Sequence, residues 1–128
     1  MSGPTPALMK EINAAFNSRD MDRIMACFAE DATFLMARGP EADGRRVRGK
    51  AAIREVIADR FKVITDMRWE HVDAFICGDR AVSVWMVTGT GTDGEKLNYR
   101  GCDIYEFRGD QILNKHTYWK LVEQRERL

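Results

Sequence analysis

The sequence has no excess of charge, no long apolar run and no leader-like start. Its 20 Lys and Arg residues equal its 20 Asp and Glu residues, so it lacks the basic excess typical of nucleic-acid-binding proteins. No apolar segment is long enough to cross a bilayer. Residues 1–6 lack the charged head and apolar stretch of a signal peptide. We therefore expect a cytoplasmic protein with neither a nucleic-acid nor a membrane partner.

Cysteine and histidine are scarce and scattered. The three cysteines, Cys27, Cys77 and Cys102, are an odd set without the spacing of metal ligands, so reduced thiols are expected. The two histidines, His71 and His116, fall on different predicted strands with no clustered carboxylates nearby. Phosphate-binding and dinucleotide-binding glycine motifs are also missing. We expect no metal and no cofactor.

Helical periodicity marks the first half of the chain. Thr5 before a proline is typical of a helix cap, and apolar residues then recur at helical spacing, which predicts a helix over residues 6–17. Asp20 caps a second, short predicted helix, and Gly49 opens a third that extends to Ile64. The apolar side of the second helix is expected to comprise Ile24, Met25, Cys27 and Phe28.

Strands make up the rest of the prediction. Ala32 to Ala37 is short and apolar, and residues 38–48 form a loop rich in Arg, Gly and Pro. Beyond residue 66 the apolar period changes to two, with hairpin-type turns between segments. The four predicted strands run from Met67 to Ile76, Ala81 to Gly91, Lys96 to Phe107 and Gln111 to Leu121.

Helices followed by long antiparallel strands indicate one α+β domain over residues 1–128. A single sheet of this length must bend over the helices to bury its inner face. Gly89, Gly91 and Gly101 lie within predicted strands, where glycine marks a bulge or a bend. The expected shape is a cone with an open mouth.

Several segments carry a family resemblance from about residue 7 to 121. The chain resembles the nuclear transport factor 2-like superfamily and, within it, the ketosteroid isomerase-like and SnoaL-like polyketide cyclase branch. The resemblance implies a cone-shaped α+β fold, with about three N-terminal helices packed in a strongly bent, mixed, mostly antiparallel sheet. The matching segments are Ala14-Ala15-Phe16-Asn17, Asp20-Met21-Asp22, Cys27-Phe28-Ala29-Glu30-Asp31-Ala32-Thr33, Gly49-Lys50-Ala51-Ala52-Ile53-Arg54-Glu55 and Asp103-Ile104-Tyr105-Glu106-Phe107 with Gly109 and Ile112.

The resemblance carries over only part of a known active site. Asp103 falls where ketosteroid isomerases keep a protonated aspartate that donates to the substrate oxyanion. The partner tyrosine of that family falls on Ile12, and its aspartate base falls on Met36. The Arg and Asp groups of limonene-epoxide-hydrolase-like members fall roughly on Val84, Met86 and Thr117. The resemblance therefore implies the cone and not one particular reaction.

Asp103 and Lys115 are the predicted catalytic residues. The resemblance implies that Asp103 faces the pocket, and strand alternation then puts Lys115, Thr117 and Trp119 together on one face of the last strand. An ion pair with Lys115 would keep Asp103 ionised as a general base, whereas an apolar wall alone would make it an acid or an oxyanion donor. Lys115 could also form a Schiff base or simply extend to solvent. A purely structural aspartate, held by backbone groups or by a lysine, is the competing interpretation.

The predicted ligand site is the apolar interior of the cone. Four arginines of the 38–48 loop could draw an anionic substrate to its mouth or carry a lid, or simply be solvated; they are Arg38, Arg45, Arg46 and Arg48. The side chains predicted to line the site are Ile12, Phe16, Phe34, Met36, Ile57, Trp69, Met86, Thr88, Tyr99, Thr117 and Trp119. Family members commonly pair through the outer sheet face, which implies a homodimer here through Trp85, Ile104 and Tyr118.

We therefore expect a small-molecule-binding protein. As an enzyme it would be a cofactor-free isomerase, dehydratase or cyclase that acts by acid–base chemistry on a small apolar or ketone-bearing substrate. The alternative is a non-catalytic ligand-binding or dimeric assembly module of the same fold. The replacement of two isomerase positions by Ile12 and Met36 favours that alternative.

Overall fold

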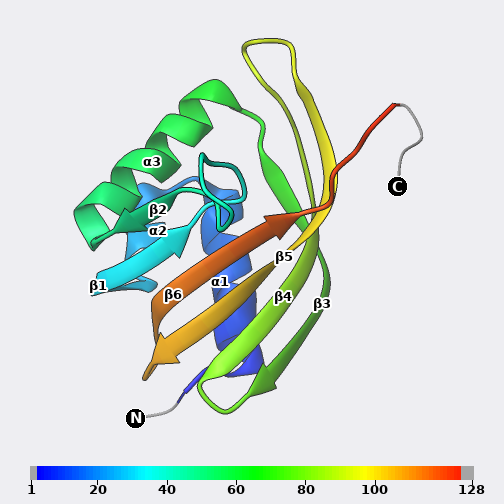
Figure 1. The fold of residues 1–128 in the computed structure, drawn as a ribbon. Helices are drawn as coiled ribbons and strands as arrows, with labels where there is room; N and C mark the ends of the chain where they lie inside the picture. The colour runs from blue at the N-terminus through cyan, green and yellow to red at the C-terminus, as the bar shows by residue number, and fades with distance from the viewer. Residues whose placement is uncertain (1–2, 125–128) are drawn as a thin grey trace.

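The computed structural model describes residues 3–124, which form three helices and one sheet (Figure 1). The helices are α1 (Pro6–Ser18), α2 (Met21–Met25) and α3 (Lys50–Val63). The strands are β1 (Phe28–Leu35), β2 (Arg46–Arg48), β3 (Arg68–Cys77), β4 (Arg80–Thr90), β5 (Lys96–Arg108) and β6 (Gln111–Trp119). None of these helices is both long and apolar enough to span a membrane.

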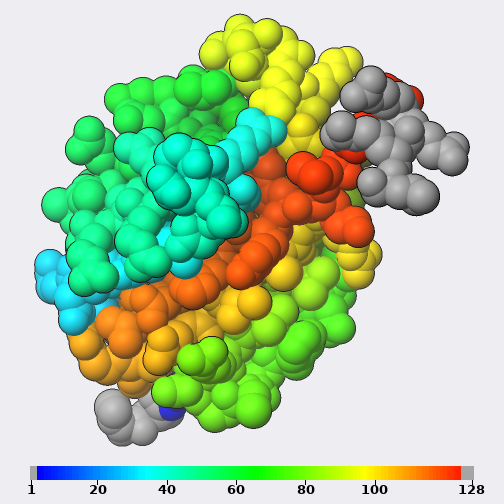
Figure 2. Space-filling view, in the orientation of Figure 1, coloured from blue at the N-terminus to red at the C-terminus, as the bar shows by residue number. Residues whose placement is uncertain are grey.

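The six strands form an open, mixed sheet in the order β2-β1-β6-β5-β4-β3. β1 and β6 run parallel, and every other neighbouring pair is antiparallel. Helix α1 packs against β3 and α3 packs against β1, so the helices cover one face of the sheet (Figure 1). The other face of β4, β5 and β6 has no helix on it, as the space-filling view also shows (Figure 2).

Local sequence signals explain where the first helix begins and what it buries. The Thr5 hydroxyl accepts a hydrogen bond from the Leu8 amide at 3.1 Å, and Pro6 occupies the first turn. Arg19 ends the helix in the left-handed conformation, with φ of 58°. The helix buries one stripe, and this stripe faces the main core; its residues are Met9, Ile12, Ala15 and Phe16.

The structure confirms the α+β class, α1, α3 and the four long strands, and it corrects two details. Phe28 belongs to β1 and not to the second helix, so the first strand begins four residues before the predicted Ala32. The 38–48 loop contains β2, which pairs with the end of β1. Only Val47 is apolar in β2, and one apolar residue between two arginines gives no strand periodicity.

The prediction of which β4 residues face inward is wrong by one position. Met86 and Thr88 point to the outer face, and Trp85, which was expected there, is buried inside. Residues 81–87 are apolar except for Ser83, and this polar residue faces inward, so the alternation of polar and apolar residues indicates the wrong face. The residues that face inward are Ala81, Ser83, Trp85 and Val87.

Gly101 allows a close contact between its strand and the Trp85 ring and does not mark a bulge. The register shifts of β3 and β5 lie at His71/Asp73 and at Glu106/Phe107, away from the strand glycines. A Cβ on Gly101 would lie 2.5 Å from the carbonyl oxygen of Tyr118 and 2.6 Å from the indole ring of Trp85. The missing side chain therefore lets the Trp85 ring lie against β5.

We predict that Gly101→Ala lowers the free energy of unfolding by about 1–3 kcal/mol, because the buried Trp85 ring must shift. Urea unfolding followed by tryptophan fluorescence measures this loss. Gly3→Ala is the matched control, since a Cβ there meets only the carbonyl oxygen of Gly78 at an ordinary 3.6 Å. Equal stability of the two variants would contradict the role assigned to Gly101.

Candidate functional site

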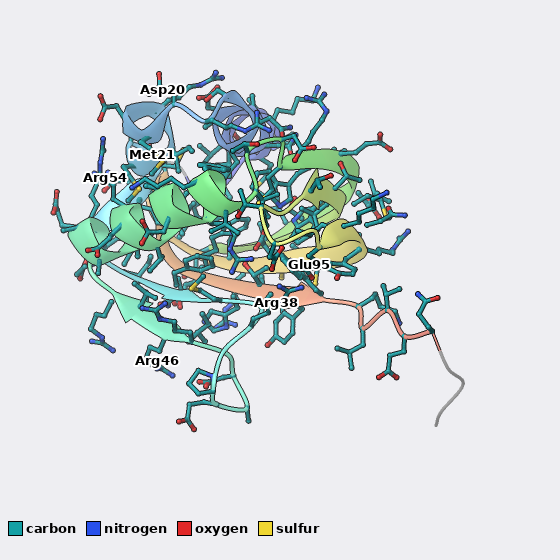
Figure 3. All side chains as sticks on the ribbon, turned by 90° about the horizontal axis from the view of Figure 1, so that it is seen from above. Asp20, Met21, Arg38, Arg46, Arg54 and Glu95 are labelled. Carbon is teal, nitrogen blue, oxygen red and sulfur yellow. The ribbon has the colours of Figure 1, made fainter. Side chains whose placement is uncertain are left out.

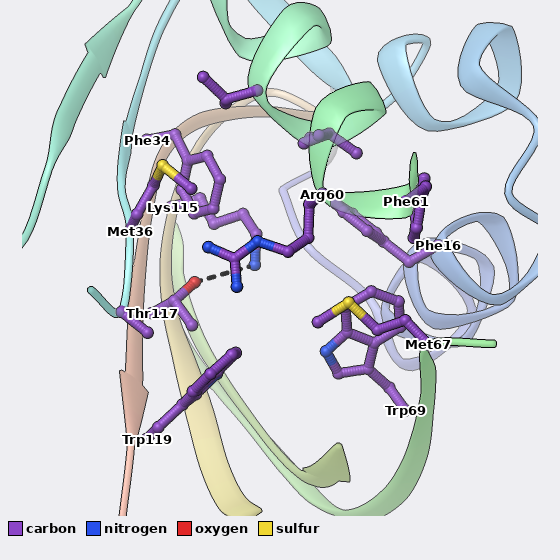
Figure 4. A pocket seen from close by; sticks show the side chains of 13 residues that line it. Phe16, Phe34, Met36, Arg60, Phe61, Met67, Trp69, Lys115, Thr117 and Trp119 are labelled. Atoms are coloured by element: carbon purple, nitrogen blue, oxygen red, sulfur yellow. Dashed lines mark hydrogen bonds between the residues drawn. The ribbon is translucent and has the colours of Figure 1, made fainter. Parts of the chain in front are cut away.

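An apolar cavity of about 60 Å³ lies between α1, α3 and the inner face of the sheet (Figure 4). This space exceeds the roughly 10–15 Å³ that one buried water needs, but it is small compared with the ligand pockets of most enzymes. The lining residues are Phe16, Phe34, Met36, Ala37, Val56, Ile57, Arg60, Phe61, Met67, Trp69, Lys115, Thr117 and Trp119. Almost all of this wall is apolar, and the polar groups within it are few.

Lys115 and Asp103 form an ion pair at the floor of this cavity. Both residues are buried, with 6% of Lys115 and 4% of Asp103 exposed. The Lys115 ammonium donates to Oδ1 of Asp103 and, at 3.1 Å, to the Thr117 hydroxyl. Lys115 and Thr117 line the main cavity, whereas Asp103 lies below them. A ligand in the cavity therefore meets the lysine before it meets the carboxylate.

Four donors surround the Asp103 carboxyl group. Oδ1 accepts from Lys115 and Thr117, and Oδ2 accepts from Nε1 of Trp85 at 2.9 Å and from the Tyr105 hydroxyl at 3.3 Å. An indole N–H and an ammonium can only donate, so this arrangement fits a carboxylate that accepts on both oxygens. Each buried polar group of the cluster thereby has a partner, which a buried ion pair requires.

Tyr105 remains a neutral phenol in this cluster. Burial raises its pKa well above the ordinary value of 10, and the negative charge of Asp103 together with the hydrogen bond to it raises it further. Tyr105 therefore acts as a donor to Asp103 and does not supply a second negative charge near Lys115.

Aromatic rings enclose the Lys115 ammonium from the remaining sides. The nitrogen lies 5.2 Å from the ring centres of Phe16 and Phe34, and 5.4 Å from that of Tyr105. Cation–π contacts of this kind stabilise a cation that has lost part of its hydration. The three rings and the Asp103 carboxylate together hold the Lys115 ammonium at the end of the apolar cavity.

At the mouth of the cavity, the guanidinium groups of Arg38 and Arg60 both lie against the indole ring of Trp119. Arg38 lies 5.0 Å and Arg60 lies 5.7 Å from the ring centre of Trp119. Arg38 also forms two hydrogen bonds with Glu95, which lowers the pKa of that carboxyl. Figure 3 shows Arg38 and Glu95 close together, and Figure 4 shows Arg60 reaching from α3 toward Thr117 and Trp119.

The structure brings most of the predicted site residues together, although their functional roles remain predictions. Ile12 and Asp103 border a smaller cavity of about 20 Å³ below the ion pair. Tyr99 packs against Trp119 at 5.3 Å and donates to Glu95, outside the cavity lining. Those that line the main cavity are Phe16, Phe34, Met36, Ile57, Trp69, Lys115, Thr117 and Trp119. Met86 and Thr88, on the outer face, lie outside the site.

The predicted site omitted several residues of the observed one, among them Ala37, Val56 and Phe61 of the cavity lining. Trp85 was placed on the wrong face, and Arg60 was overlooked. A signal for Arg60 was present, because it follows Ile53 by seven residues and Ile57 by three, so it interrupts the apolar stripe of α3. Arg45, Arg46 and the rest of the predicted basic loop border a charged groove that adjoins the cavity and shares Arg60 with it. Of the four loop arginines, only Arg38 reaches Trp119.

The histidines lie outside the cavity. His71 borders an exposed groove between α1 and β3, and His116 lies on the outer side of β6. Within residues 3–124 no three His, Cys, Asp or Glu side chains come together as a candidate metal site. Burial raises the pKa of the Cys27 thiol to about 11, so this cysteine is not a reactive thiolate.

We predict that Lys115→Met lowers the free energy of unfolding by about 3–5 kcal/mol, because it leaves Asp103 as an uncompensated buried charge. Asp103→Asn/Lys115→Met should recover most of this loss, since both charges are then removed together. Chemical denaturation of the wild type, both single variants and the double variant gives the coupling energy. Additive effects of the two substitutions would show that the pair is not coupled.

Comparisons with known proteins fit this architecture. A family profile described as "SnoaL-like domain" matches residues 9–114, and no curated protein matches the sequence. A hypothetical protein of Catenulispora acidiphila with a ketosteroid isomerase-like fold, in complex with trimethylamine, is 19% identical; the match covers 92% of this chain and 88% of that one, with a TM-score of 0.78.

Two further solved structures are similar. A candidate polyketide cyclase from Xanthomonas campestris is 21% identical over 89% of this chain and 88% of its own, with a TM-score of 0.77. TerC, co-crystallised with polyporic acid, is 20% identical over 89% of each chain, with a TM-score of 0.75. At these identities the structures establish the fold alone. Because the profile covers most of the chain, this protein belongs to the SnoaL-like domain family.

Proposed function

We propose that the protein is a cofactor-free enzyme that binds a small, apolar, ketone-bearing molecule and moves a proton next to its carbonyl group. The observation that carries the proposal is the charged Lys115–Asp103 pair at the end of an otherwise apolar cavity. Burying a charge is costly, and hydrophobic residues of similar volume are often no less stable than a buried ion pair. A buried pair next to a cavity therefore favours a role in chemistry.

Lys115 is the group that would meet the carbonyl oxygen of the ligand. Its ammonium is fixed by Asp103 and Thr117, and it lines the cavity where few other donors compete. A fixed cation in an apolar, water-poor site stabilises the negative charge that develops on the oxygen as an enolate forms. Asp103 acts through Lys115 in this scheme, which revises the sequence-based expectation of direct contact with the ligand.

The same pair offers a route for the proton. Transfer from the Lys115 ammonium to Asp103 leaves a neutral amine and a carboxylic acid, with no change in total charge. The amine can then take a proton from the carbon beside the ketone, which regenerates the ammonium next to the enolate. Return of this proton to the same carbon gives hydrogen exchange, and in a β,γ-unsaturated ketone its return to the γ-carbon gives an isomerisation. Within the described part of the chain, the cavity lining contains no carboxylate and no histidine that could serve as a separate base.

A second candidate function is ligand binding without turnover. The small volume and the absence of a second acid–base group from the described lining favour it. Trimethylamine and polyporic acid accompany two proteins of this fold, so small molecules of different chemistry occur with it. In this version Lys115 and Thr117 only orient the ligand. The two functions differ in whether the bound ketone exchanges its hydrogens with solvent.

Hydrogen–deuterium exchange tests the proposal without knowledge of the natural product. We predict that the protein accelerates exchange of the α-hydrogens of cyclohexanone in D₂O, followed by proton NMR. Lys115→Met should reduce the protein-dependent rate by about 100-fold or more, the usual contribution of an acid–base group. Thr117→Val, which keeps the shape and removes the hydroxyl, should have a smaller effect.

Two controls keep this test decisive. Lys62→Met removes an exposed lysine of α3 and should leave the exchange rate unchanged. Asp103→Asn/Lys115→Met should be inactive while it stays folded, which separates lost chemistry from lost stability. If wild-type protein binds cyclohexanone and does not accelerate exchange, the binding-only function holds.

We also propose that two copies pair through the outer face of β3, β4, β5 and β6. An apolar row crosses this face, in which Phe75 pairs with Val82 and Val82 pairs with Ile104. Phe75 is 56% exposed and Tyr118 is 55% exposed, and large exposed apolar groups on one face favour a partner surface. The apolar side chains on this face are Val72, Phe75, Val82, Val84, Met86, Cys102, Ile104 and Tyr118.

For this pairing we predict a dimer in sedimentation velocity, and a monomer for Ile104→Lys, because a charge at the centre of the apolar face opposes association. Val63→Lys is the matched control, since Val63 is an exposed valine on α3, away from the sheet face. It should leave the sedimentation coefficient unchanged. A wild-type monomer at every concentration tested would rule out the pairing.

A further inference from the structure

Arg60 is the cavity-lining cation without an ionic partner. Across residues 3–124 its guanidinium forms no hydrogen bond and no ion pair, and its named contact is the face of the Trp119 ring. Lys115, the other cation of the lining, is paired with Asp103. The five N–H donors of Arg60 are therefore available at the mouth of the cavity.

The surroundings of Arg60 do not favour an isolated charge. Burial lowers the pKa of its guanidinium, and the positive charge of Arg38 lowers it further. The side chain leaves α3 between apolar neighbours and reaches across the cavity, as Figure 4 shows. A half-buried arginine that gives up hydration without gaining a partner is costly unless a ligand supplies one.

The charges at the mouth do not cancel. Arg38 and Glu95 engage each other through two hydrogen bonds, and the Tyr99 hydroxyl donates to Glu95 at 3.0 Å. The Lys115–Asp103 pair at the floor is neutral in total. Around the Trp119 ring, the guanidinium groups of Arg38 and Arg60 are accompanied by one carboxylate, Glu95, which pairs with Arg38, so Arg60 carries the unpaired positive charge there.

We propose that the ligand of this cavity carries a carboxylate, which Arg60 binds at the mouth while the ketone oxygen meets Lys115 at the floor. This inference deepens the proposed function and rests on the same cavity. It assigns the substrate class as a small oxo acid with an apolar body. The body would pack against the indole rings of Trp69 and Trp119, which form opposite walls in Figure 4.

A carboxylate fits this position better than a phosphate. One unpaired positive charge balances a monoanion, and a planar guanidinium matches a planar carboxylate through two parallel hydrogen bonds. Arg38 is engaged by Glu95, so it does not add a second free charge for a dianion. Among the described residues, the cavity lining apart from Arg60, Lys115 and Thr117 is aromatic or aliphatic, so it offers no cluster of free cations for a phosphate.

Calorimetric titration with benzoate and benzamide tests the inference, because the two probes differ in charge and little in shape. The wild type should bind benzoate about tenfold or more tightly than benzamide, the factor expected for charge-assisted hydrogen bonds. Arg60→Met keeps an apolar stem and should abolish this preference, because it weakens benzoate binding far more than benzamide binding. Tryptophan fluorescence provides a second readout, since Trp69 and Trp119 line the cavity.

Arg54→Met is the matched control on the same helix. Arg54 pairs with exposed Asp22 and points toward α2, away from the cavity, so the preference for benzoate should persist (Figure 3). Lys115→Met should also keep the preference. Equal affinity for the two probes, no binding of either, or a preference that survives Arg60→Met and disappears in Lys115→Met would overturn the inference.

The outcomes separate this inference from the proposed function. Cyclohexanone has no carboxylate, so Arg60→Met should lower its hydrogen exchange far less than Lys115→Met does if Lys115 performs the chemistry. A benzoate preference that depends on Arg60 in a protein without exchange activity would support carboxylate binding and reject catalysis. Exchange activity without any benzoate preference would support catalysis and reject the carboxylate.

Discussion

The buried pair of Lys115 and Asp103 is the interaction on which the site depends. Both charges lie inside an apolar cone, where each would be unfavourable alone. Three further donors, from Trp85, Tyr105 and Thr117, complete the coordination of the carboxylate. The carboxylate thus fixes the position of the ammonium, and the fold presents that ammonium to the cavity.

The sheet supplies this geometry from three adjacent strands. Asp103 on β5 is in register with Thr117 on β6 and with Ser83 on β4, so the side chains around the pair come from one inner face. Gly101 lets the Trp85 ring lie close to β5, and α1 and α3 add the aromatic and aliphatic walls. The Lys115 ammonium at the floor of the cavity therefore comes from β6, and the Arg60 guanidinium at its mouth comes from α3.

Much of this arrangement was predictable from the sequence. The family resemblance put Asp103 on the inner face, and strand alternation then grouped Lys115, Thr117 and Trp119 on one face of β6. In β4 the polar Ser83 faces inward, so the same alternation misplaced Trp85.

Other parts of the site depend on side-chain packing, which cannot be read from a single sequence. Three of the four donors to Asp103 come from other strands, and the volume of the cavity follows from how side chains such as Arg60 fill it. Periodicity identifies which face a residue occupies, whereas the contacts made on that face follow from the assembled sheet and helices.

The most direct test of the central claim is a crystal structure of the protein with cyclohexanone bound. We predict that the ketone oxygen lies within hydrogen-bond distance of Lys115 Nζ, about 2.7–3.2 Å, with the ring against the aromatic wall. A ketone bound elsewhere, or bound in the cavity with its oxygen turned away from Lys115, would contradict the account.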